Sequence, residues 1–376
     1  MAVLASQQFQ AAVKQSHNAI VTVTAQRGPT SFALDFTDGK ITQSYDDASR
    51  WMMDLTFPVP SGYTPDSLKN LLNQRATTLR PARGIQFADG TSEVMNFAKF
   101  YVTDVDLDEQ AGGAPVIKVL AYDRSVRCQG DMSKSFYIPA NSSPTLMTAQ
   151  LLNSKVPGIT FALASSLWLT PPLLVTQDMD AWDEARRMMS ASGQDLYFDR
   201  EDRCVSSVRS LTPNATGVWH FDENNNPDFW DVKRHGSNDI FPNIVNVVGT
   251  NPAAPGIAGQ AADMDPSSPT YRFGDYGEIV RTFRSEHITT TLQANSMAAY
   301  LLAKLLGPQD EVTLSAIPNP MLDVGDTVLL TRVSMGFSAT PLLVVKIEMP
   351  LTIGGSMTVT LRRSILTDIY GSVTRP

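Results

Sequence analysis

The 376-residue chain has few of the side chains on which metal sites and covalent catalysis most often depend. Its two cysteines, Cys128 and Cys204, are far apart and form no CxxC pair, so neither a structural zinc site nor a disulfide framework is expected. No two histidines stand at HxxH or HxxxH spacing; they are His17, His220, His235 and His287. No P-loop, GxGxxG or GxSxG motif occurs. The sequence therefore predicts no catalytic, cofactor-binding or metal-ligating residue, and no cofactor.

Long apolar runs are also missing. The N-terminal segment 1–17 has no cationic start before an apolar run, so it does not read as a signal peptide. The most apolar window, 161–175, is interrupted by Pro171 and Pro172 and is too short to span a bilayer. We therefore expect a soluble protein that is made in a cytoplasm and does not insert into a membrane.

A positive net charge is absent as well. The formal net charge is −8, which argues against a nucleic-acid-binding protein, because such proteins usually present a basic surface. Hydrophobic residues make up 43% of the chain and charged residues 18%, values typical of a soluble globular protein. A chain of this length has room for about two to four domains, each with its own core.

What the chain does contain is period-two alternation of apolar and polar residues, most clearly in residues 311–363. Such alternation between turn signals indicates strands with one buried face. Turns are expected at Asn319-Pro320, Gly325-Asp326 and Gly354-Gly355. The alternating apolar positions are Val312, Leu314, Ala316, Val328, Leu330, Val344, Ile347, Met357, Val359 and Leu361. About four or five such strands predict a small antiparallel barrel or sandwich.

Residues 17–124 have the same character, with hairpin signals at Asp38-Gly39 and Asp89-Gly90. The following section differs. One helix is expected to begin at Ser143-Pro144, and a second, capped by Asp178 or Asp180, to end before Gly193. A hairpin with the charged turn 199–203 follows, and we expect the carboxylates of that turn to be solvated. Helix and hairpin together predict a compact α+β unit.

These patterns predict a mainly β protein with α+β insertions, in which two small antiparallel β-barrels flank a helix-and-hairpin middle domain. The predicted limits are 1–124 for the first barrel with an N-terminal arm, 125–235 for the middle domain and 236–376 for the second barrel. The second barrel is expected to carry an inserted loop at about 250–288 and a helix at about 289–306. Within that insertion, 252–269 shows no periodicity and is expected to be an exposed loop or arm.

The acidic run 104–109 has aspartates at every second position, as at the start of a calcium-binding loop. Read as such a loop, it would have Glu109 where the sharp turn needs glycine and Pro115 where a bidentate glutamate is needed. The alternative interpretation is the solvated face of a strand, and the mismatches favour it. Whether the run binds a cation is left open by the sequence.

Four aromatic residues surround an asparagine-rich loop within 219–230: Trp219, Phe221, Phe229 and Trp230. They could stack on sugars, or they could bury the loop against its domain. The second role is the commoner one for such residues, but the sequence does not decide between the two.

The order of these pieces resembles the tail-tip or baseplate hub proteins of tailed phages, and more closely the minor tail proteins of long-tailed phages of actinobacteria. The resemblance covers nearly the whole chain, but its motifs are structural turns and not catalytic signatures. Where family members tend to carry two arginines, this chain has Arg50-Trp51. The matching segments are 17–36, 39–42, Arg50, 54–56, 182–184, 193–199, 243–249, 268–269, 318–326, 350–351, 354–357 and 361–363.

This resemblance implies a hub with two related β-barrels per chain, three chains forming a ring of six barrels. Such a ring can meet a hexameric tail tube, since each subunit presents a similar surface twice. The implied partners are two further copies of the chain, the tail tube or distal tail protein, the tape measure protein and other tail-tip proteins. Genomic DNA would only pass through the lumen, where an acidic lining would not hold it. The implied location is the distal end of the virion tail, assembled in the host cytoplasm.

Some hubs of this group continue into a peptidoglycan hydrolase or a receptor-binding region, whereas this chain stops at Pro376. We therefore expect a non-enzymatic hub. The competing hypothesis is a carbohydrate-binding or depolymerising tail protein acting on the host surface. It depends on the aromatic loop and on the many carboxylates, no pair of which stands out for glycoside hydrolysis.

Overall fold

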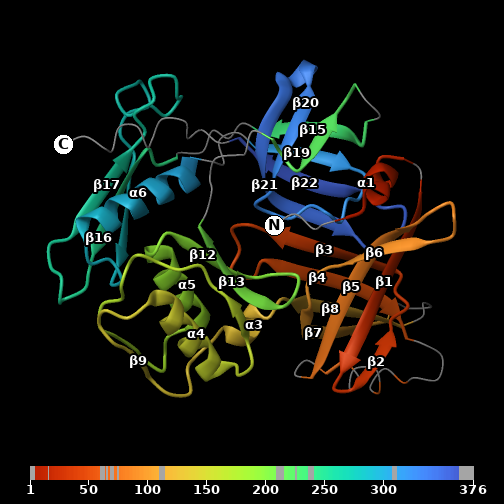
Figure 1. Ribbon diagram of the computed structural model, residues 1–376, viewed down its shortest axis with the longest axis horizontal. Coiled ribbons are helices and arrows are strands. Elements are labelled where there is room, and N and C mark those ends of the chain that lie inside the picture. The colour runs from red at the N-terminus through yellow and green to blue at the C-terminus, as the bar shows by residue number, and fades with distance from the viewer. Residues whose placement is uncertain are drawn as a thin grey trace.

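The computed structural model of the protein (Figure 1) describes residues 5–15, 17–59, 64, 67, 72–73, 76–109, 115–208, 216–224, 227–235, 241–306 and 311–363. Within these residues the chain is mainly β, with few helices and several sheets in which antiparallel pairing dominates. The predicted fold class is thus confirmed at this coarse level. No helix of the described part is both long and apolar enough to cross a membrane.

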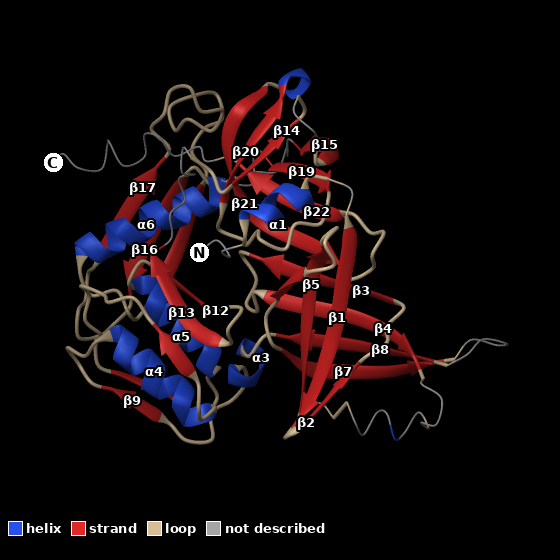
Figure 2. Cartoon of the chain, turned by 45° about the vertical axis from the view of Figure 1, so that its right-hand side comes forward, coloured by secondary structure: helices blue, strands red, loops and turns tan. Residues whose placement is uncertain are grey.

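A single 14-stranded sheet contains strands from both ends of the chain. Eight of its strands follow one another in one layer, and every neighbouring pair is antiparallel. In spatial order this eight-strand layer consists of β15 (Phe229–His235), β19 (Glu311–Ala316), β22 (Met357–Arg362), β21 (Phe337–Pro350), β3 (Asp38–Ser44), β4 (Trp51–Pro58), β8 (Val116–Tyr122) and β7 (Phe100–Asp108). Figure 2 shows these strands stacked from β15 at the top to β7 at the bottom.

The pairing of β3 with β21 joins the two β-rich halves of the chain. Ile41 lies opposite Met349 and Thr42 lies opposite Glu348, although about 300 residues separate these partners. The strands β5 (Thr77–Gln86), β1 (Asn18–Arg27), β2 (Thr30–Ala33) and β6 (Ser92–Asn96) form a second layer that crosses β3, β4, β8 and β7 (Figures 1 and 2). On the other half, β20 (Thr327–Arg332) pairs with β21 and with β14 (Trp219–Asp222), and α1 (Gln7–Val13) contributes Phe9 and Val13 to the same core.

Two separate barrels were predicted, but the described strands close neither half into a barrel. The two halves instead share one hydrophobic core cluster that contains residues from Phe9 to Leu361. The strands β14 and β15 also join this large sheet, whereas the sequence places residues 219–235 in the middle segment. Turn signals and alternation mark individual strands, but they carry no information on which distant strand becomes the neighbour.

Period-two alternation explains how the eight-strand layer buries one face. In β4, Met53, Leu55 and Phe57 are each at most 1% exposed, while the intervening residues are half-buried. In β22, Met357 and Val359 are fully buried in the same way. Each such side chain contributes about 1.5–3 kcal/mol when it leaves water.

The middle of the chain forms a separate α+β unit with its own core, as the helix and hairpin signals predict. Asp180 is the N-cap of α5, since its carboxylate accepts the N–H of Asp183 at 2.9 Å. Cys128 and Cys204 are both buried and free in this core, and burial raises the pKa of the Cys128 thiol to about 12. Its elements are α3 (Ser125–Cys128), β9 (Phe136–Ile138), α4 (Pro144–Lys155), β10 (Thr160–Ala162), β11 (Leu173–Val175), α5 (Ala181–Ala191), β12 (Gln194–Phe198) and β13 (Arg203–Val208).

A third core lies under α6 (Thr291–Leu306), which packs on the sheet of β17 (Ala258–Ala262), β16 (Ile244–Gly249) and β18 (Val280–Ser285). The sequence predicts an exposed loop at 252–269, but this segment contains β17. The buried carboxylate of Asp263 accepts hydrogen bonds from the hydroxyls of Ser268 and Thr270, at 2.5 and 2.7 Å. Buried hydrogen bonds of this kind order a segment whose sequence shows no hydrophobic periodicity.

Candidate functional site

The eight-strand layer presents a continuous polar face on the side opposite its core. Strand register brings these side chains into rows, because residues paired across an antiparallel sheet lie on the same face. Glu348 lies opposite both Thr42 and Thr358, and Lys118 lies opposite both Thr56 and Asp106. We call this surface the polar face; its members include Lys40, Thr42, Asp54, Thr56, Asp104, Asp106, Asp108, Lys118, Asp231, Lys233, Glu311, Thr313, Ser315, Lys346, Glu348, Thr358, Thr360 and Arg362.

Charges of both signs alternate with hydroxyls on the polar face. Lys118 pairs with Asp108 at 2.8 Å, and the hydrogen bond that the amine donates to this carboxylate raises the pKa of Lys118. Lys346 pairs with Glu348 at 2.6 Å, and this hydrogen bond lowers the pKa of the Glu348 carboxyl. Exposed ion pairs of this kind contribute little to stability. Because of these pairs, the polar face has no row of cations in excess of its anions. A surface that binds phosphates tightly needs such an excess.

The acidic run 104–109 falls on the polar face. Asp104 and Asp106 are exposed on β7, while Val105 between them points into the core at 8% exposure. This is the alternation of a solvated strand face, the interpretation that the sequence favours. Within the described part of the chain, no group of three or more His, Cys, Asp or Glu side chains is placed to hold a metal ion.

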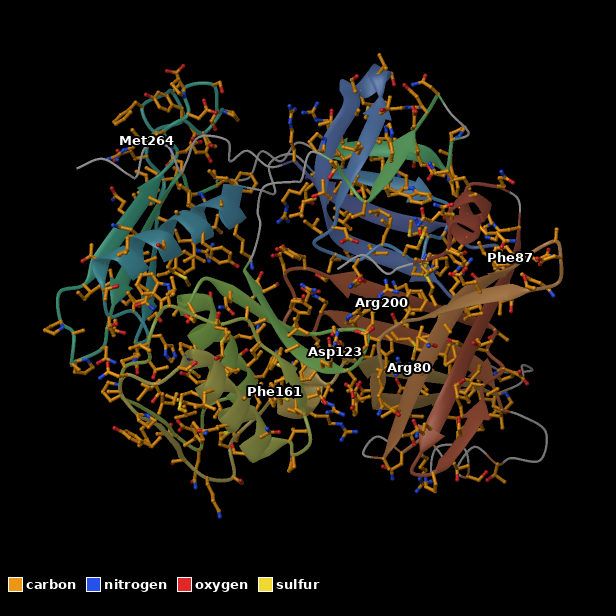
Figure 3. All side chains as sticks on the ribbon, in the orientation of Figure 1. Arg80, Phe87, Asp123, Phe161, Arg200 and Met264 are labelled. Atoms are coloured by element: carbon orange, nitrogen blue, oxygen red, sulfur yellow. The ribbon has the colours of Figure 1, made fainter. Side chains whose placement is uncertain are left out.

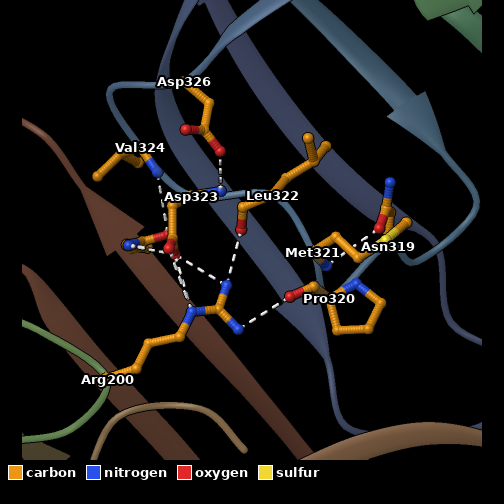
Figure 4. Close-up of polar contacts among 9 residues, drawn as sticks. Arg200, Asn319, Pro320, Met321, Leu322, Asp323, Val324 and Asp326 are labelled. Atoms are coloured by element: carbon orange, nitrogen blue, oxygen red, sulfur yellow. Dashed lines mark hydrogen bonds and ion pairs between the residues drawn. The ribbon is translucent and has the colours of Figure 1, made fainter. Parts of the chain in front are cut away.

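Arg200, in the turn between β12 and β13, links the middle unit to the large sheet (Figures 3 and 4). Its guanidinium donates to the carbonyl oxygens of Pro320 and Leu322, each at 2.9 Å, and to the Asp323 carboxylate at 2.8 Å. It also lies 5.4 Å from the ring centroid of Trp51 and the same distance from that of Phe97. The Arg200 side chain is 7% exposed. The prediction that the carboxylates of this turn are solvated is wrong at Asp202, whose side chain is 11% exposed.

Asp202, two residues further on, forms a second anchor. Its carboxylate accepts from the Tyr101 hydroxyl at 2.9 Å and pairs with Arg124 at 2.7 Å. Burial raises the pKa of the Asp202 carboxyl and that of the Tyr101 hydroxyl. Asp202 also has a φ of +62°, which few non-glycine residues adopt. Two buried charge contacts within one short turn therefore fix how the middle unit sits on the sheet.

A cleft of about 780 Å³ lies between the middle unit, the α6 unit and the loop 44–50. Arg50 stacks over the Tyr197 ring at 3.4 Å from its centroid, which gives this arginine a packing role. At the cleft, the Nε2 atom of His287 lies 2.7 Å from Glu184, and both side chains are 5% exposed. This pair joins α5 to the segment after β18. The hydroxyl of Ser285, the last residue of β18, accepts the backbone N–H of His287 at 3.3 Å.

Within the described residues, the other histidines and the aromatic residues singled out in the sequence do not meet in one site. His220 contacts the Thr331 hydroxyl at 2.9 Å and takes no part in the His287 pair. The aromatic loop is a core element: Trp219, Phe221 and Phe229 are at most 9% exposed. The Trp219 ring donates its N–H to the Asp228 carboxylate at 2.6 Å. Only Trp230 of the four, at 57% exposure, is open to a ligand, so the residues proposed for sugar stacking do not form a platform.

Comparison with known proteins defines the fold as that of phage tail proteins. No family model matches the sequence, and no curated relative matches it. Solved structures do match, at sequence identities that show the fold alone.

A tail protein from Neisseria meningitidis aligns with a TM-score of 0.65 at 10% identity, over 91% of this chain and 96% of that one. A 43 kDa prophage tail protein from Shewanella oneidensis gives 0.62 at 14% identity, over 92% and 98%. A component of the type VI secretion system from E. coli gives 0.52 at 8% identity, over 90% and 75%. That component is itself described as structurally similar to the phage T4 tail proteins gp27 and gp5.

Proposed function

We propose that this protein is a non-enzymatic hub of a phage tail tip, built as a ring of three copies. The observation that supports this most is the single sheet that runs through both halves of the chain and presents one polar face. A sheet of this extent with one solvated face is suited to line a channel. The fold shared with phage tail proteins, and the resemblance of the sequence to hub proteins of actinobacterial phages, support the same assignment.

In this proposal the polar face lines the lumen through which DNA leaves the virion. Its paired charges and hydroxyls would let DNA pass, since no excess of cations is there to hold the phosphates. The two halves of each chain would act as two similar lobes, so that three copies present six lobes to a hexameric tail tube. The tape measure protein and other tip proteins would be further neighbours, at the distal end of the tail. The barrel-like closure of each lobe on assembly is part of this proposal. So are the domain limits 1–124, 125–235 and 236–376, except that residues 219–235 belong with the large sheet.

The proposal predicts the mass of the purified protein in solution. Light scattering across a concentration series should give a trimer of about 123 kDa, three times the chain mass of 41.0 kDa. The trimer fraction should rise with protein concentration and remain after ion exchange and gel filtration. A single copy at every concentration up to the solubility limit would contradict a self-assembling ring.

A further inference from the structure

We propose that a small pocket on the outward face of β1 and β5 binds an anionic sugar, a saccharide unit that carries a carboxylate or a phosphate. The pocket has a volume of about 250 Å³. Pockets for drug-sized ligands measure about 300–1,000 Å³, so this one fits a smaller molecule. Binding there would not depend on the proposed ring. The lining residues are Thr22, Thr24, Gln26, Ser31, Thr78, Arg80, Ala82, Asn96 and Lys99.

The floor of the pocket is a short side chain among longer ones. Ala82 of β5 lies opposite Thr22 of β1 on one side and opposite Asn96 of β6 on the other. Residues paired across antiparallel strands share a face of the sheet, so Thr22 and Asn96 stand as walls beside Ala82. Ala82 is 6% exposed although it is not a member of the core cluster. The hollow is therefore built into the register of three strands.

A change of strand neighbour brings two cations together in the pocket. Along its length β5 pairs first with β7 and then with β6. Where the neighbour changes, the N–H of Phe97 donates to the Pro81 carbonyl at 3.0 Å, which holds the connecting segment against β5. Lys99 follows in that segment. Because Phe100 pairs with Leu79, the register places Lys99 at the level of Arg80.

The lining combines these cations with uncharged hydrogen-bonding groups and contains no carboxylate. Four hydroxyls and two side-chain amides surround Arg80 and Lys99. Arg80, labelled in Figure 3, donates one long hydrogen bond, of 3.5 Å, to the carbonyl of Arg200. The ammonium of Lys99 lies 5.8 Å from the ring centroid of Tyr101. Neither cation takes part in an ion pair with a described residue. Such a lining complements a ligand with one anionic group among several hydroxyls.

The carboxylate of Asp202 does not neutralise the pocket, because Arg124 already pairs with it at 2.7 Å. Burial raises the pKa of the Asp202 carboxyl, and Arg124, Lys99 and Arg80 act against that rise. Three cations thus surround one carboxylate, and the local charge is positive in a chain whose net charge is −8. Two cations in a hollow of this size suit a single anionic group, whereas nucleic acid requires a row of them.

Isothermal titration calorimetry of the purified protein tests the pocket with four probes. Glucuronate and glucose 6-phosphate carry both an anionic group and sugar hydroxyls, whereas glucose lacks the charge and inorganic phosphate lacks the sugar. We expect at least one of the two anionic sugars to bind at least about tenfold more tightly than glucose and than inorganic phosphate. Phosphate that binds as tightly as either sugar would show an anion site only, and would refute the proposal. Failure of both anionic sugars to bind would refute it as well.

Substitutions show whether the ligand occupies this pocket. Lys99→Gln and Arg80→Gln should each weaken binding of the anionic sugar at least about tenfold, because each removes a charge that meets the anionic group. Thr22→Val keeps the shape of the side chain but removes its hydroxyl. It should weaken sugar binding about fivefold and leave phosphate binding unchanged. The matched control is Lys134→Gln, an exposed lysine of the middle unit, which should change neither affinity. If all three pocket variants bind the sugar like the parent, the pocket is refuted.

Light scattering of the same samples separates this proposal from the proposed hub. A trimer that binds neither anionic sugar would refute the pocket and leave the hub intact. A single copy that binds an anionic sugar, and loses it with Lys99→Gln, would support the pocket and contradict the self-assembling ring. Thermal unfolding of each variant shows whether it folds, and Lys99→Gln remains informative if Arg80→Gln disturbs the contact with the Arg200 carbonyl.

Discussion

Replacing Arg200 with alanine is expected to lower the free energy of unfolding by about 3–5 kcal/mol, the usual cost of removing one partner of a buried ion pair. The guanidinium is 7% exposed and the Asp323 side chain 16% exposed, so the carboxylate would keep little access to water. Two carbonyl oxygens, those of Pro320 and Leu322, would lose their donors as well. Urea unfolding followed by tryptophan fluorescence measures the change, since Trp51 packs beside the guanidinium.

Arg203 provides the matched control because it occupies the same turn. Its side chain is 46% exposed and pairs with Asp199 at 2.7 Å, so Arg203→Ala should cost less than about 1 kcal/mol. Arg200→Lys should recover only part of the loss, because an ammonium cannot reach two carbonyls and a carboxylate in the planar fork of a guanidinium. Equal effects of Arg200→Ala and Arg203→Ala would show that the buried junction does not fix the middle unit.

Lysines placed on the polar face are expected to make the protein bind DNA much more strongly than the parent chain does. Asp54→Lys, Thr313→Lys and Thr358→Lys together change the net charge of each chain from −8 to −4 and place the new cations on one surface. If the polar face lines a channel, the lysines of all three copies point at one DNA duplex inside it. We expect binding of a short linear duplex at 50 mM salt that weakens about 10³-fold by 200 mM salt, because each phosphate contact releases counterions.

The control for this experiment has the same net charge with the lysines elsewhere. Asp35→Lys, Thr30→Lys and Ser31→Lys lie on and beside the exposed edge strand β2, in the layer that covers the core from the other side. This variant should bind the duplex at least about tenfold more weakly than the polar-face variant, since its charges do not converge. Equal binding by the two variants would argue that the polar face does not line an enclosed channel.

Local patterns in the sequence predict much of this structure because they depend on near neighbours. The alternation at Val312, Leu314 and Ala316 marks β19, and that at Met357, Val359 and Leu361 marks β22; all six side chains are buried. The N-cap residue Asp180 and Gly193, which follows α5, likewise predict a helix that the structure contains. In each case a period of two or a capping residue follows directly from backbone geometry.

Contacts between residues far apart in the chain could not be predicted from such local patterns. No local sequence pattern around Ile41 or Met349 predicts that their strands pair, because the register of a strand depends on the whole layer. Arg200 stands in a turn of five charged residues, a composition that is usually solvated, and its buried partners are two backbone carbonyls and an aspartate more than 100 positions away. Trp219 resembles a sugar-stacking residue in sequence, and only its contact with Asp228 shows it to be part of the core.

Electron cryomicroscopy of the purified protein tests the central claim most directly. The account predicts a closed ring of three copies with six lobes, in which Asp54 and Thr358 face the channel. A ring whose channel is lined by the opposite layer, β1 and β5, or particles that are always single copies, would contradict it.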